Sequence, residues 1–143
     1  RLLDGVDGAL ARQQGRQSDF GGYVDVLLDF VVYATVPLGV AFSLDNPNNM
    51  LSVGVLLATY YVNSASWMYL SALLEKRQNG VFATQEQTSV TMPESIVGGT
   101  ETVVAYVLFL ALPTHFAGLA LVFSLLIAVG VAQRLLWAWR HLR

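Results

Sequence analysis

The sequence predicts an all-α integral membrane protein, a polytopic helix bundle, and three observations support this fold class. Of the 143 residues, 55% are hydrophobic and only 13% are charged, whereas about a quarter of the residues of a soluble domain are charged. Four stretches are apolar over the length of a membrane helix, about 20 residues, or nearly so. All Lys and Arg residues lie outside two of the loops between these stretches. This composition excludes an ordinary soluble domain and a disordered chain.

Net charge and cysteine content exclude further classes of protein. The chain has 8 Lys and Arg against 10 Asp and Glu, a formal net charge of −2, which is unlike a strongly basic nucleic-acid-binding domain. It has no Cys, so a disulfide-stapled secreted domain and a thiolate metal site are excluded. We therefore expect the lipid bilayer as a partner and no nucleic acid.

The predicted membrane helices span residues 20–44, 50–74, 96–112 and 116–139. A turn cluster at residues 45–49, Asp-Asn-Pro-Asn-Asn, separates the first two stretches. The polar stretch 76–95 separates the second from the third, and its Pro93 suits a first helical turn. Residues 112–115 make a tight reversal before the last stretch. Residues 1–12 have the pattern of the last turns of another helix, so we expect one domain over residues 1–143 that is N-terminally incomplete.

The basic residues predict how the chain is oriented in the membrane. With four crossings, the loops 45–50 and 112–116 share one side of the bilayer, and neither contains Lys or Arg. The other side then holds all eight basic residues: Arg1, Arg12, Arg16, Lys76, Arg77, Arg134, Arg140 and Arg143. The excess of positive charge assigns that side to the cytoplasm. In a bacterium we expect the inner (cytoplasmic) membrane, with the active site on the cytoplasmic face.

Four carboxylates are unusual for membrane helices. Asp25 and Asp29 lie one turn apart within the first predicted crossing, so they share a helix face, and Asp4 and Asp7 share a face three residues apart. Ionised carboxylates at one membrane depth repel each other and cost several kcal/mol each without compensation. Divalent cations compensate them, because Mg²⁺, Mn²⁺ and Ca²⁺ prefer hard oxygen ligands. Two helices that each offer a carboxylate pair predict a two-metal site.

Small residues accompany these carboxylates at helical spacing. Gly8 and Ala11 continue the face of Asp4 and Asp7, and Gly21 lies one turn before Asp25. Small side chains there let a bulky ligand approach the backbone.

The spacing of these residues resembles the signature of the CDP-alcohol phosphatidyltransferase family. The matching stretch reads Asp4-x2-Asp7-Gly8-x2-Ala11-Arg12-x8-Gly21-x3-Asp25-x3-Asp29. At roughly one chance in fifteen per position, agreement at all eight specified positions has a random probability on the order of 10⁻⁹. The resemblance implies a fold of six transmembrane helices, of which this chain holds the end of helix two and helices three to six.

The resemblance also implies a reaction and roles for individual residues. The family transfers a phosphatidyl or related group from a CDP-linked donor, such as CDP-diacylglycerol, to an alcohol and releases CMP. It implies two Mg²⁺ or Mn²⁺ ions held by Asp4, Asp7 and Asp25. Asp29 would be the catalytic base for the acceptor hydroxyl and a further metal ligand. The CDP moiety would contact Gly8, Ala11, Arg12 and Gly21. Family precedent implies a homodimer.

The acceptor is less well indicated by the sequence. Phosphorylated acceptors need basic side chains near the inner ends of the later helices, and the candidates Lys76, Arg77 and Arg134 all lie near predicted helix ends. This favours an unphosphorylated alcohol, while glycerol phosphate and inositol phosphate stay open. Candidate acceptor-site residues are Lys76, Arg77 and Glu101, an ionisable residue within a predicted membrane helix. Glu101 could equally pair with a cation on a neighbouring helix. We expect Asn63 to make an interhelical hydrogen bond.

Two other functions compete with the transferase. Intramembrane carboxylates also mark the pathways of cation transporters and channels. Such a pathway would need polar groups toward the outer side, where these helices are nearly all apolar. The chain could also be a non-catalytic membrane subunit, although its full set of carboxylates argues against this.

Overall fold

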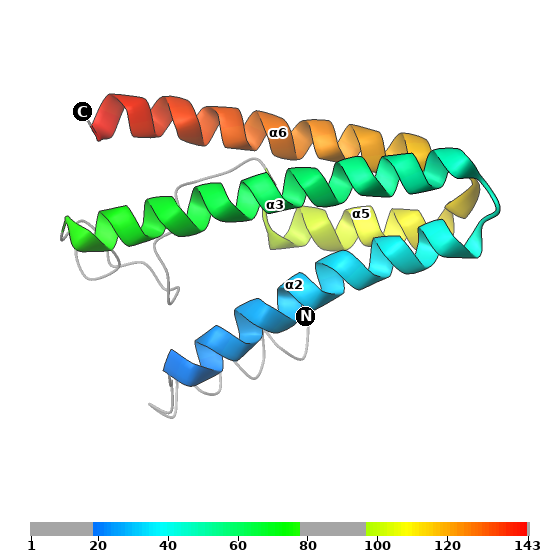
Figure 1. Ribbon diagram of the computed structural model, residues 1–143, viewed down its shortest axis with the longest axis horizontal. Helices are drawn as coiled ribbons and strands as arrows, with labels where there is room; N and C mark the ends of the chain where they lie inside the picture. Colours follow the sequence, from blue (N-terminus) through cyan, green and yellow to red (C-terminus); the bar gives the residue numbers. More distant parts are fainter. Residues whose placement is uncertain (1–18, 78–96, 143) are drawn as a thin grey trace. The chain divides into compact units, whose positions relative to one another are not determined.

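A computed structural model of the chain is all-helical over the residues that it describes, 19–77 and 97–142 (Figure 1). The long helices are α2 (Asp19–Ser43), α3 (Pro47–Lys76) and α6 (Phe116–His141), and α5 (Gly99–Ala111) is shorter. A single 3₁₀ turn, η1 (Pro113–His115), joins α5 to α6. The chain divides into two compact units, Arg1–Tyr33 and Ala34–Arg143, and α2 runs across the boundary between them.

Among the residues that the structure describes, two helices are long and apolar enough to cross a membrane. They cover Phe20–Ser43 and Pro113–His141, and α5 is a shorter apolar helix. The third long helix, α3, is less apolar because Asn, Ser and Tyr side chains interrupt it. Backbone groups have no water to bond with in lipid, so an all-helical chain is the form that satisfies them within each segment. The composition and the structure together confirm an all-α membrane helix bundle.

The breaks between helices have local causes. The α3 helix begins after Asn46, whose side-chain Oδ1 accepts a hydrogen bond from Asn48 N at 3.0 Å, and Pro47 occupies the first turn, where no backbone donor is lost. Within α3 and α6, Ser and Thr hydroxyls donate to carbonyls four residues earlier. Ser52 to Asn48 and Ser124 to Ala120 are examples, each at 2.7 Å. These bonds satisfy polar side chains inside the bundle.

One part of the core of the second unit is an aromatic cluster near the turn between α5 and α6. Phe109 is 1% exposed and lies edge-on to Phe116 and Phe123, with ring centroids 5.2 and 6.3 Å away. Tyr106 packs against Phe109, and its hydroxyl lies 3.1 Å from the hydroxyl of Tyr60 on α3. The cluster therefore joins three helices, and α3 and α6 pack against each other beside it (Figure 1).

Replacing Phe109 by Ala is expected to destabilise this unit by about 3 kcal/mol, because the cavity removes contacts to three rings. The adjacent Leu110 is 63% exposed, so the matched Leu110→Ala variant should cost less than about 1 kcal/mol. Thermal unfolding in detergent measures both changes. Equal losses for the two variants would contradict the central place of Phe109.

Candidate functional site

The first half of α2 carries the described part of the predicted metal site. Gly21, Asp25 and Asp29 follow one another at four-residue steps, so they lie along one face of this helix. Asp25 is exposed and Asp29 is half-buried. Two hard oxygen donors on consecutive turns fit the ligand preference of a divalent cation. The described residues thus include two of the four predicted ligands, and these two share one face of α2.

Tyr33 extends the same line by one more turn and was not singled out from the sequence. Its hydroxyl donates a hydrogen bond to Asp29 Oδ2 at 3.4 Å, and its ring lies edge-on to Phe30 with centroids 6.4 Å apart. A donor on one carboxylate oxygen helps to orient the carboxylate. The four-residue spacing between an Asp and a Tyr on one helix was the sequence signal that could have identified this pair.

The other predicted half of the site lies outside the described residues. This applies to Asp4, Asp7, Gly8, Ala11 and Arg12, so their convergence on Asp25 and Asp29 stays a prediction. Within residues 19–77 and 97–142, no group of three or more His, Cys, Asp or Glu side chains could hold a metal ion. The described residues alone therefore do not make a complete two-metal site, and the predicted ligands Asp4 and Asp7 lie outside them.

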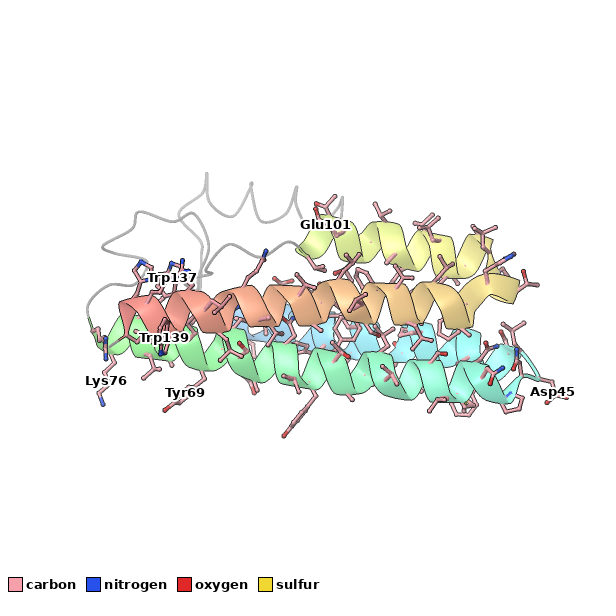
Figure 2. All side chains as sticks on the ribbon, turned by 90° about the horizontal axis from the view of Figure 1, so that it is seen from above. Asp45, Tyr69, Lys76, Glu101, Trp137 and Trp139 are labelled. Atoms are coloured by element: carbon pink, nitrogen blue, oxygen red, sulfur yellow. The ribbon has the colours of Figure 1, made fainter. Side chains whose placement is uncertain are left out.

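Glu101 lies in the first turn of α5 (Figure 2), where it closes the beginning of the helix. Its Oε2 accepts a hydrogen bond from the backbone N–H of Gly98 at 2.9 Å. A carboxylate in this place also interacts favourably with the positive end of the helix dipole. A Cβ at position 98 would come within 3.1 Å of that oxygen, so Gly98 leaves room for it. In the structure, the side chain of Glu101 thus caps the beginning of α5.

The two basic candidates at the end of α3 are both exposed. Lys76 occupies the last turn of the helix. Arg77 follows it and donates from Nη2 to the carbonyl oxygen of Leu142 at 3.0 Å, which ties the end of α3 to the end of α6. Exposed basic side chains next to a membrane helix are attracted to anionic lipid headgroups.

The third basic candidate, Arg134, is buried. It lies about two turns before the end of α6, and it is 5% exposed. Its Nη1 donates to Asn63 Oδ1 at 3.1 Å and to Ser66 Oγ at 3.3 Å, both on α3. The expected interhelical hydrogen bond of Asn63 is therefore present. Its donor lies 71 residues away in sequence, which no local pattern could show.

Comparison with known proteins places these features in a family. Residues 1–138 match the CDP-alcohol phosphatidyltransferase family. The chain is also 40% identical over 129 residues to the inner membrane protein YnjF of Escherichia coli (strain K12), an alignment that covers 88% of this chain and 60% of that protein. No solved structure matches the chain. With the family match over nearly its whole length, the chain belongs to the CDP-alcohol phosphatidyltransferase family.

Proposed function

We propose that the protein transfers a phosphatidyl group from CDP-diacylglycerol, or a similar CDP-linked lipid, to an alcohol and releases CMP. The family match over residues 1–138 carries this proposal. The arrangement on α2 supports it, because Asp25 and Asp29 lie on consecutive turns of a helix long and apolar enough to cross a membrane. Ionised carboxylates within a membrane helix cost free energy unless a partner compensates their charge.

Each of the predicted site residues has a proposed role in the reaction. Asp4, Asp7 and Asp25, with Asp29, would hold two Mg²⁺ or Mn²⁺ ions. When bound, these would neutralise the charge that develops on the diphosphate. Asp29 would take the proton of the acceptor hydroxyl. The oxygen of that hydroxyl would bond to the phosphorus that carries the lipid, while the bond from this phosphorus to the CMP oxygen breaks. Gly8, Ala11, Arg12 and Gly21 would contact the CDP moiety. Tyr33 would hold the Asp29 carboxylate through the hydrogen bond to Oδ2.

The acceptor that we propose is an unphosphorylated alcohol. The basic candidates for a phosphorylated acceptor are few: Lys76, Arg77 and Arg134. Lys76, Arg77 and Glu101 remain candidate contacts for the acceptor. The clustering of basic residues supports an active site on the cytoplasmic face, and family precedent supports a homodimer.

The direct test is CMP release by the full-length protein in detergent with CDP-diacylglycerol, Mg²⁺ or Mn²⁺, and a panel of acceptors. The panel includes serine, inositol, glycerol, glycerol phosphate and inositol phosphate. We expect metal-dependent CMP release with one unphosphorylated alcohol, which the same assay identifies. Release only with a phosphorylated acceptor would refute the proposed acceptor class. No release with any acceptor or either metal would refute the reaction and favour a non-catalytic role.

A further inference from the structure

A groove runs between α3 and α6 in the second unit of the chain. It has a volume of about 420 Å³, within the range of small-molecule binding sites. Its walls are largely apolar and come from both helices: Val62, Ala65 and Leu70 from α3, and Val131, Leu135 and Ala138 from α6. The groove is open along its side, where Tyr69 is 68% and Leu135 is 63% exposed.

The groove contains a buried cation that lacks an anionic partner within the described part of the chain. Arg134 lines it and is 5% exposed. Its hydrogen bonds run from Nη1 to neutral groups, the side chains of Asn63 and Ser66 and the backbone of Asn63. Its Nε is buried without an acceptor. A buried guanidinium without an anionic partner is costly, and an anion in the groove would offset the cost of the buried charge.

The end of the groove has the features of a membrane–water interface. Figure 2 shows Tyr69, Lys76, Trp137 and Trp139 near the same end of this unit, far from Asp45. Tyr and Trp are enriched where a helix passes the lipid headgroups. Leu142 lines the groove, and its carbonyl binds Arg77, so a second guanidinium lies at that end. The groove therefore has a cationic end at the membrane interface, and the rest of its walls are apolar.

We propose that this groove binds an anionic phospholipid. The lipid phosphate would accept hydrogen bonds from Arg134, and one acyl chain would lie along the apolar walls. Basic pockets between transmembrane helices are known to bind anionic headgroups. The apolar lining argues against a free phosphate or a polar acceptor, and the uncompensated charge argues against a zwitterionic lipid. This lipid would bind between α3 and α6, within the second unit of the chain.

Native mass spectrometry of the full-length protein tests this proposal. The protein is delipidated in detergent and offered phosphatidylglycerol and phosphatidylethanolamine with identical acyl chains. We expect about a fivefold preference for phosphatidylglycerol, which corresponds to the contribution of one basic side chain near a membrane surface. Arg134→Gln should abolish the preference. The control Arg140→Gln should keep it, because Arg140 is exposed on the same helix and is not part of the groove wall.

A second variant keeps the test decisive if Arg134→Gln does not fold. Ala65→Phe adds bulk to an exposed position of the groove wall and leaves Arg134 unchanged. It should lower phosphatidylglycerol binding at least fivefold. Equal binding of the two lipids by the wild-type protein, or unchanged preference in both Arg134→Gln and Ala65→Phe, would overturn the proposal. So would a dimer that binds no lipid and dissociates in Ala65→Phe, because a second copy would then occupy the groove.

Discussion

Asp29→Asn is expected to lower kcat for CMP release about 10³-fold, within the range that a positioned general base contributes. The substitution keeps the size of the side chain and leaves an oxygen that can accept the hydrogen bond from Tyr33. It removes the group that we propose as the base for the acceptor hydroxyl. The expected loss is therefore in turnover, with the helix content of the protein unchanged by circular dichroism.

Asp45→Asn is the matched control for that variant. Asp45 is exposed in the turn between α2 and α3, and the same chemical change there should alter kcat less than about twofold. An Asp29→Asn enzyme with full activity would contradict the assignment of the base. A loss shared equally by Asp45→Asn would show that general damage to the protein, and not the missing base, lowers the rate.

Asp25→Ala is expected to remove most of the stabilisation that divalent cations give the protein. A ligand present at 100 times its Kd stabilises the folded state by about 2.7 kcal/mol. Asp25 lies one turn before Asp29 on the same face, so the loss of its oxygens would leave that face with one of its two acidic ligands. We expect the rise in Tm with Mn²⁺ to disappear in Asp25→Ala and to persist in Asp45→Ala. An undiminished rise in Asp25→Ala would contradict its role as a ligand.

The parts of this protein that the sequence could predict depend on local periodicity. The alternation of apolar stretches with turn residues indicates a helical membrane protein, because about 20 apolar residues of helix are needed to cross the bilayer. The shared face of Asp25 and Asp29 follows from the helical repeat alone. The beginning of α3 follows from the capping Asn46 and from Pro47.

The parts that could not be predicted depend on contacts between distant segments. Arg134 lies about two turns before the end of α6, where a long basic side chain can reach the interface, but its side chain is buried. Its partners, Asn63 and Ser66, are known only from the packing of α6 on α3. Glu101 had two open interpretations, an acceptor contact or an ion pair. The structure shows a bond to the Gly98 backbone.

We propose that four carboxylates, those of Asp4, Asp7, Asp25 and Asp29, hold a pair of metal ions. Electron paramagnetic resonance of the full-length protein with Mn²⁺ tests it most directly, because ions within about 4 Å of each other give a coupled signal. We predict two coupled Mn²⁺ ions per chain in the wild-type protein and loss of the coupled signal in Asp25→Ala. One isolated ion per chain, no bound Mn²⁺, or a coupled signal that survives Asp25→Ala would contradict the claim.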